Sequence, residues 1–211
     1  MKNIIAILSL LVTMAAGAQK STQNISISYS MKVENSPAAA LMGDMHINIF
    51  FKNGQYLTEM GGANYSLKTL VNDSGTLILS NSIAAKFFSK EPPRPKKQNS
   101  VEPDVTYIDS TKEIAGFTCK KALVMVNHHD DKDTAVFWYT EKLPVIAFGE
   151  AAKLFQGLRG MPLEYTVSGK EMKITLVAIK VSTDPIPDAV FQLSTEGYNE
   201  LPGIGLKGGQ Q

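Results

Sequence analysis

The sequence is poor in cysteine, since Cys119 is the only copy among 211 residues. No intramolecular disulfide can therefore form, and the fold must be stabilised by packing. A buried lone cysteine commonly behaves as a small apolar residue. Because no histidine or second cysteine adjoins Cys119, we predict a packing role for its thiol, with a redox or dimerisation site as the alternative.

The sequence has no marked excess of either charge, because 21 basic and 20 acidic residues give a formal net charge of +1. Proteins that bind nucleic acid usually carry a basic surface that releases counterions from the phosphates. The cluster of Arg94, Lys96 and Lys97 is too short to supply such a surface. We therefore expect no nucleic-acid partner.

The sequence also lacks an apolar run of the roughly 20 residues that a membrane-spanning helix needs. Its apolar stretch at residues 4–16 follows Lys2 and leads into Ala16-Gly17-Ala18, which is the pattern of a secretory signal peptide. We predict that residues 1–18 are removed after Ala18, which leaves an exported, periplasmic or extracellular chain. No cysteine directly follows that point, so a lipid tether is not expected.

Apolar and polar residues alternate through most of the remaining chain. In residues 24–35, Ile25, Ile27 and Tyr29 alternate with serines, which is typical of a half-buried strand. Similar patterns predict strands at 45–51, 55–60, 65–71, 76–80, 104–109, 117–126, 135–140, 161–168 and 171–182.

The predicted strands are separated by residues that favour turns. Asn53-Gly54 and residues 72–75 suit tight hairpins, and the polar residues 127–133 suit a hairpin tip. Four prolines make residues 91–103 an irregular excursion. Apolar spacings of three and four predict one helix at 145–158, which Gly157 and Gly160 would end.

Many hairpins and one late helix favour a mainly β fold over alternating βαβ units. We predict a strongly curved antiparallel sheet or half-barrel covered by one or two short helices, with a sandwich as the alternative. Residues 19–200 are long enough to form a single domain with a sizeable core, and the glycine-rich residues 201–211 suit a flexible tail. A short helix over a wide sheet can leave a crevice for a ligand.

The sequence contains no motif of a hydrolase or of a regular metal site, so we predict neither enzymatic activity nor a cofactor. Glu59 and Glu164 would form a candidate carboxylate pair if the fold brought them together, and the sequence does not give their separation. His128 and His129, within a His-His-Asp-Asp run, are weak candidates for metal ligands, and the alternative is a solvated hairpin tip.

Methionine and aromatic residues are the candidates for an apolar binding site, because they can line an adaptable pocket for acyl chains. A packed core needs the same residue types, so both roles stay open for each of them. The candidate lining residues are Met31, Met45, Phe51, Phe137, Tyr139, Phe155 and Met161.

Two short stretches resemble known families. Residues 155–165, Phe-Gln-Gly-Leu-Arg-Gly-Met-Pro-Leu-Glu-Tyr, look like the motif of the GLPGLI family of exported bacterial proteins, with Arg159 in place of its proline. Residues 114–121, Ile-Ala-Gly-Phe-Thr-Cys-Lys-Lys, resemble a motif of a related family of unknown function. The resemblance implies a fold like that of the lipoprotein carrier LolA, in which a curved sheet wraps helical cover around an apolar cavity. It implies no catalytic residues.

Two functions are compatible with these features. The first is a non-enzymatic exported protein that binds a hydrophobic or amphiphilic ligand, such as a lipid or acyl chain, in a crevice between sheet and helix. The second is a structural or protein-interaction module of the cell envelope with a fully packed core. A metal-dependent envelope protein that uses His128 and His129 is a weaker third candidate.

Overall fold

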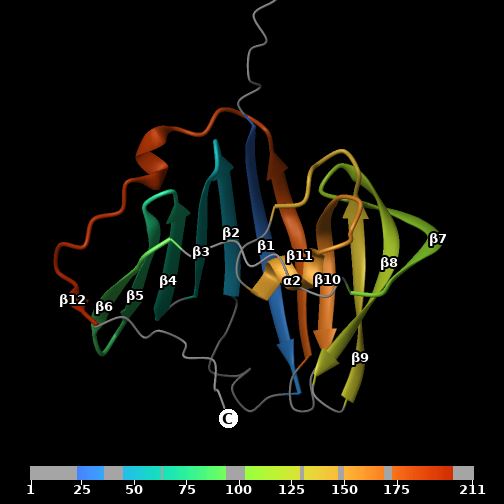
Figure 1. Ribbon diagram of the computed structural model, residues 1–211, viewed down its shortest axis with the longest axis horizontal. Coiled ribbons are helices and arrows are strands. Elements are labelled where there is room, and N and C mark those ends of the chain that lie inside the picture. Colours follow the sequence, from blue (N-terminus) through green and yellow to red (C-terminus); the bar gives the residue numbers. More distant parts are fainter. Residues whose placement is uncertain are drawn as a thin grey trace, which may run out of the picture.

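The structure is a computed structural model that describes residues 23–35, 45–62, 64–93, 103–128, 131–146, 150–168 and 173–201. These residues form one sheet of 12 strands (Figure 1). The strands are β1 Asn24–Glu34, β2 Met45–Lys52, β3 Gln55–Gly62, β4 Tyr65–Asn72, β5 Gly75–Ser82, β6 Lys86–Glu91, β7 Val105–Ile114, β8 Phe117–His128, β9 Asp131–Thr140, β10 Met161–Ser168, β11 Lys173–Ser182 and β12 Asn199–Glu200. The helices are α2 Glu150–Phe155 and the 3₁₀ turn η1 Asp188–Phe191.

The strand order is β12-β6-β5-β4-β3-β2-β1-β11-β10-β9-β8-β7. The chain thus runs from β1 to one edge, resumes at the opposite edge with β7, and returns to pair β11 with β1. Neighbouring strands are antiparallel except β12, which is parallel to β6. The sheet is open and curved, so the prediction of a mainly β chain with one curved sheet is confirmed.

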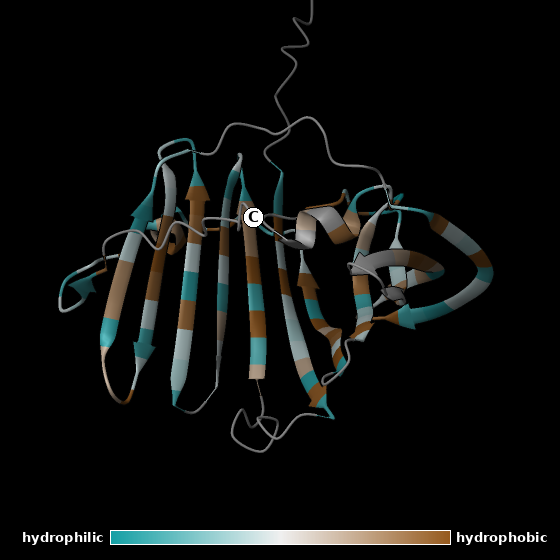
Figure 2. Cartoon of the chain, turned by 60° about the horizontal axis from the view of Figure 1, so that its bottom comes forward, coloured by the Kyte–Doolittle hydropathy of each residue, from teal (hydrophilic) through white to brown (hydrophobic). Residues whose placement is uncertain are grey.

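The sheet has two faces that carry different cover (Figures 1 and 2). We call the side on which α2 packs the helix face; it carries Ile27 and Ile49 in the middle of the sheet and Phe137 beneath the helix. The other side, which we call the reverse face, carries Leu57 and Leu70. These two pack against Ile186 and Phe191 in and beside η1, together with Phe50, Leu77, Val190 and Leu193.

The hairpin turns follow the predicted turn residues. Asn53 (φ 51°) and Gly54 (φ 82°) both have positive φ, as the tightest β-hairpin turns require. Asn72 Oδ1 accepts a hydrogen bond of 2.9 Å from the Ser74 amide, which shapes the turn between β4 and β5. The predicted junction at residues 114–116 joins β7 to β8, with Ala115 and Gly116 also at positive φ.

Several elements differ from the sequence prediction. Strand β7 continues to Ile114. Strand β9 begins at Asp131 and pairs with β8, so these paired strands take up much of the hairpin tip predicted at 127–133. The helix covers Glu150–Phe155 of the predicted 145–158, because Ile146 lies in irregular backbone with its side chain buried and Gly157 has a positive φ. Strand β6 was not predicted, since its adjacent residues Phe87 and Phe88 interrupt the alternation; in the sheet they face opposite sides. Strand β12 is only two residues long and has no sequence pattern of its own.

Several predictions fall outside the described residues. They are the signal peptide at 1–18, most of the tail at 201–211, and His129 at the β8–β9 tip. His128 ends β8, but the structure describes only its backbone. Within the described part of the chain, no helix is long and apolar enough to cross a membrane.

Candidate functional site on the helix face of the sheet

The helix face carries apolar side chains over β3 to β6 that the described helices leave partly open. Met60, Leu67, Ile78 and Phe87 are each half-buried, and none belongs to the buried clusters formed by the described residues. We call these four residues the apolar patch. Because they come from four consecutive strands, their positions are fixed by the strand register.

The register places the apolar patch next to the buried core. Met60 pairs with Leu67 and with Ile47 of β2, and Ile47 pairs with the fully buried Tyr29. Side chains directly opposite each other on one face have Cβ atoms about 5 Å apart and pack together. The patch is therefore an extension of the core face toward β6.

Beneath α2 the same face is closely packed. Phe155 of α2 lies edge-on to Phe137, with ring centroids 5.8 Å apart, and to Tyr165 at 5.2 Å. Phe137 and Tyr165 stack at 5.7 Å with an interplanar angle of 16°. Phe137, Tyr139 and Phe155 are at most 3% exposed and belong to one buried cluster, so packing between α2 and the sheet buries all three candidate lining residues.

The other candidate lining residues lie around this centre. Met45 is buried, while Met31 and Phe51 are half-buried, and all three occupy the helix face of β1 and β2. Met161 is fully buried at the start of β10, where its Sδ atom lies 3.4 Å from the Ile146 amide. Of the three on β1 and β2, the register places Met45 diagonally next to Met60 of the apolar patch, whereas Phe51 lies opposite Tyr56 and Met31 lies one strand further away on β1. A role for any of the seven in lining a ligand site stays a prediction.

Two tyrosines tie the core to β10. The Tyr29 hydroxyl donates a hydrogen bond of 2.6 Å to the carbonyl oxygen of Pro162, and its ring lies edge-on to Tyr165. Burial raises the pKa of Tyr29 well above its ordinary value, and burial also raises the pKa of Tyr165. Both phenols stay neutral across the physiological range, which suits a structural role.

The main polar cluster lies on the reverse face, where β7 curls back over the sheet. Lys112 Nζ of β7 is 2.7 Å from Glu164 Oε2 of β10 and 4.4 Å from the centre of the Trp138 ring. Cα atoms of β7 and β11, four strands apart, come within 8 Å of each other. The Lys112–Glu164 ion pair therefore holds the curled edge of the sheet in place.

Cys119 lies close to this cluster and is fully buried. Burial, with a further contribution from the Glu113 carboxylate, raises the pKa of the Cys119 thiol to about 11. A protonated, buried thiol is a poor nucleophile and a poor metal ligand. The surroundings of Cys119 therefore favour the predicted packing role.

The carboxylates and histidines do not assemble into a reactive site among the described residues. Glu59 binds Lys68 at 2.6 Å on β4, whereas Glu164 binds Lys112, and β2, β1 and β11 separate β3 from β10. His46 is exposed on the reverse face. The described part of the chain holds no group of three or more side chains suited to a metal ion.

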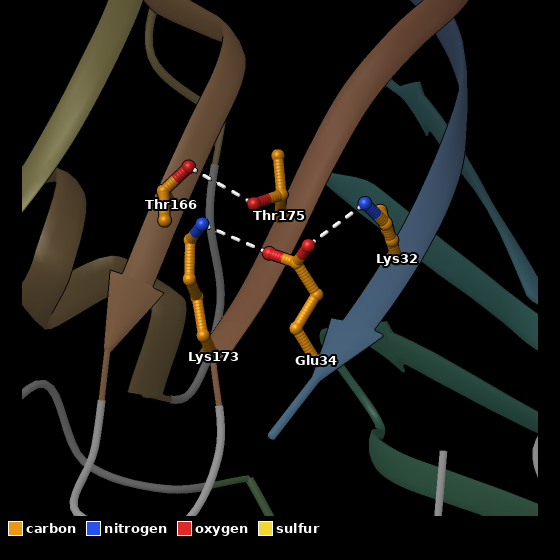
Figure 3. Close-up of polar contacts among 5 residues, drawn as sticks. All are labelled: Lys32, Glu34, Thr166, Lys173 and Thr175. Carbon is orange, nitrogen blue, oxygen red and sulfur yellow. Dashed lines mark hydrogen bonds and ion pairs between the residues drawn. The ribbon is translucent and has the colours of Figure 1, made fainter. Parts of the chain in front are cut away.

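The reverse face near the end of β1 is polar (Figure 3). Glu34 accepts hydrogen bonds of 2.8 Å from both Lys32 and Lys173, and the hydroxyls of Thr166 and Thr175 lie 3.1 Å apart. Hydrogen bonds from Lys173 and Lys32 lower the pKa of Glu34 to about 2. The two faces of the central strands therefore differ sharply, with polar contacts opposite the apolar helix face.

Two hollows of the described surface lie at hairpin ends. One, of about 240 Å³, is lined by Asn53, Gly54, Gln55, Asn72, Asp73 and Ser74. The other, of about 290 Å³, is lined by Gly62, Asn64, Tyr65, Ser66, Asn81, Ser82 and Ile83. The second hollow adjoins the apolar patch, because Tyr65 lies two residues before Leu67 on the same face of β4.

Comparison with known proteins gives similarity to solved structures only. No family model matches the chain, and no curated protein matches it. The structure of PNGF-II in C2 space group is similar over 87% of this chain and 31% of its own, with 15% identity and a TM-score of 0.39. A LolA superfamily protein from Nitrosomonas europaea is similar over 82% of this chain and 91% of its own, with 6% identity and a TM-score of 0.30. The chain thus spans about a third of PNGF-II.

These similarities establish no family for the chain, and membership of the GLPGLI family stays a prediction. The function must come from the chain's own residues. The apolar patch was not among the residues predicted from the sequence. Alternation in 65–71 and 76–80 shows that one face of each strand is apolar, but it does not show which apolar face the other described residues leave partly open.

Proposed function

We propose that this chain is an exported, non-enzymatic protein that binds a hydrophobic or amphiphilic ligand, such as a lipid or acyl chain, on the helix face beside α2. The apolar patch of Met60, Leu67, Ile78 and Phe87 is the observation that supports this proposal. Apolar side chains on four adjacent strands form a surface that is unfavourable to leave in water.

Affinity would come from burial of apolar surface, at roughly 25 cal/mol per Å² before the costs of ordering the ligand. The core under α2 supports the patch from one side, because Ile47 and Tyr29 continue its row toward β11. On the opposite side, β6 and the two-residue β12 form the edge of the sheet. A chain-like ligand lying across β3 to β6 would meet apolar side chains on each strand.

The test uses the chain without residues 1–18, purified and extracted for bound lipid, and then titrated with a fluorescent fatty acid. Replacing Ile78→Glu places a charge in the middle of the patch and is expected to weaken binding roughly tenfold or more. The matched control is Ile179→Glu, because Ile179 is 64% exposed on β11 and lies outside the patch. Equal binding by the wild type and both variants, with no lipid in the extract, would exclude the proposed site.

The close packing beneath α2 favours a second candidate, a structural or protein-interaction module of the cell envelope. The fully buried Phe137 and the 3% exposed Phe155 leave their ring surfaces no access to a ligand in this structure. This candidate predicts no fatty-acid binding and a specific protein captured by crosslinking in cells. The same titration therefore separates the two functions.

A further inference from the structure

The tip of the β5–β6 hairpin has an unusual composition. Its residues Ser82-Ile83-Ala84-Ala85 are mostly apolar, and Ile83 is 83% exposed. The turns at Asn53-Gly54, between β2 and β3, and at Asp73-Ser74, between β4 and β5, lie at the opposite end of the sheet and are polar. A single exposed apolar residue is common on protein surfaces, but an apolar residue at the apex of a tight hairpin places its whole side chain in water.

The turn that presents Ile83 is well ordered by hydrogen bonds. The Ser82 amide donates to the Ala85 carbonyl oxygen at 3.0 Å, and the Ser82 hydroxyl donates to the same oxygen at 3.1 Å. The Ala85 amide in turn lies 3.3 Å from Ser82 Oγ. These bonds pair the amides of Ser82 and Ala85 at the base of the turn, so they hold the apex that carries Ile83 and Ala84 in one conformation.

A second apolar group lies beside the tip. Tyr65 pairs with Ser82 across β4 and β5, is 38% exposed, and shares with Ile83 the hollow of about 290 Å³. The lining of that hollow contains no charged residue. The nearest charge along the hairpin is the exposed Lys86, a cation. An aliphatic apex with an adjacent tyrosine and lysine matches the chemistry of a membrane–water interface, where aromatic rings sit at the headgroups and cations meet anionic lipids.

The tip also adjoins the apolar patch. Tyr65 and Leu67 lie on the same face of β4, and Leu67 belongs to the patch, so apolar side chains continue from the hairpin end into the sheet. A bilayer in contact with the tip would face the open end of the patch. This position gives the tip a use in acquiring or delivering the proposed ligand.

We propose that the rim formed by Tyr65, Ile83 and Ala84 docks this protein on the surface of a lipid bilayer. Ile83 and Ala84 enter the acyl boundary, and the Tyr65 ring lies at the headgroups. Docking rests on these side chains rather than on ligand occupancy of the patch. It is reversible, because one inserted isoleucine contributes a factor of roughly ten to one hundred to partitioning.

The test is flotation of the chain without residues 1–18 on vesicles of phosphatidylcholine and phosphatidylglycerol. Ile83→Ser is expected to reduce the vesicle-bound fraction roughly tenfold, and Ile83→Trp is expected to raise it and to shift its tryptophan emission to shorter wavelength on binding. Ile179→Ser is the matched control, since it removes an equally apolar, 64% exposed side chain away from the rim. The control should float like the wild type.

A separate variant distinguishes docking from ligand binding. Ile78→Glu should lose the fatty acid and keep its flotation, whereas Ile83→Ser should keep the fatty acid and lose flotation. The proposal is overturned if the wild type does not float, if Ile83→Ser and Ile179→Ser lose flotation equally, or if only Ile78→Glu loses it. Circular dichroism of each variant confirms that the compared proteins are folded.

Discussion

At the scale of single residues, Gly157 and Gly160, both predicted to end the helix, are required for different structural reasons. Gly157 has a positive φ of 82° and ends α2, as the sequence prediction allowed. Gly160, which was also predicted to end the helix, is absent from the positive-φ residues. A Cβ atom built on Gly160 would instead overlap the carbonyl oxygen of Thr140. The stretch that resembles the GLPGLI motif therefore needs one glycine for its backbone angle and the other for close approach to β9.

Replacing Gly160→Ala is expected to destabilise the protein by about 3 kcal/mol, because backbone rather than a mobile side chain blocks the added methyl group. The matched control is Gly197→Ala, where φ is 77° but no atom lies within 4 Å, so about 1 kcal/mol is expected from the backbone angle. Urea unfolding measures both. A smaller loss for Gly160→Ala than for Gly197→Ala would contradict the close approach.

Glu34 makes stability depend on acid. Its pKa falls from the ordinary value of 4.5 to about 2 in the folded state, so the unfolded chain binds a proton first as pH decreases. The stabilisation is complete above about pH 4.5 and is lost as the pH falls toward 2. Urea midpoints of the wild type and Glu34→Gln should therefore converge over this window. Parallel midpoints at all pH values would show that Lys32 and Lys173 do not stabilise the folded carboxylate.

At the scale of elements, the turns and the long strands can be predicted from local sequence. The segments that pack on the two faces of the sheet cannot. Asn53-Gly54 and the alternation of Ile25, Ile27 and Tyr29 predict a hairpin and a strand because backbone angles and side-chain period are local properties. The position of α2 over Phe137, and of η1 over Leu57, depends on contacts between distant segments. The sequence does not reveal the apolar patch for the same reason, because the exposure of a sheet face among the described residues depends on which distant segments pack on it.

The curled edge of the sheet depends on the ion pair between β7 and β10. Replacing Lys112→Met leaves the partly buried Glu164 without its cation and is expected to cost about 1–2 kcal/mol, with a changed emission from Trp138, the only tryptophan. Lys112→Met combined with Glu164→Gln should recover part of that loss. The matched control is Lys120→Met, whose pair with Glu141 is exposed and is expected to contribute little. Equal losses for Lys112→Met and Lys120→Met would contradict the anchoring role.

Lys52 binds the segment after β11, at Ile186 and Asp188, to the reverse face of the sheet. Its ammonium donates to the Ile186 carbonyl oxygen at 2.6 Å and pairs with Asp188 at 2.7 Å. Lys52→Met should loosen the segment that leads to β12, so the amides of β6 should exchange hydrogen faster. Lys90→Met, on β6 itself and exposed, is the control and should leave the exchange of β6 amides unchanged. Unchanged exchange in Lys52→Met would show that η1 packing alone holds the segment.

At the scale of the whole molecule, the two halves of the sheet share one junction, the pairing of β1 with β11. The buried cluster that contains Ile27, Ile49 and Tyr29 also contains Leu176 and Ala178, so packing continues across the junction. Unfolding should therefore be a single cooperative transition. Trp138 fluorescence, which reports the β7–β11 half, and hydrogen exchange in β4 and β5 should give the same unfolding free energy. Two separate values would show that the halves unfold independently.

The β1–β11 pairing also has a consequence for the order in which the chain can fold. Ser26 lies opposite Ser182, so the central pair of the sheet joins segments at nearly opposite ends of the described chain. Strands β2 to β6 can form hairpins with their neighbours in sequence. One edge of β1 stays unpaired until β11, near the end of the described chain, is available. Late closure of this kind is slow. This protein is proposed to cross a membrane as an extended chain. Slow pairing of β1 with β11 would leave time for transport before the sheet is complete.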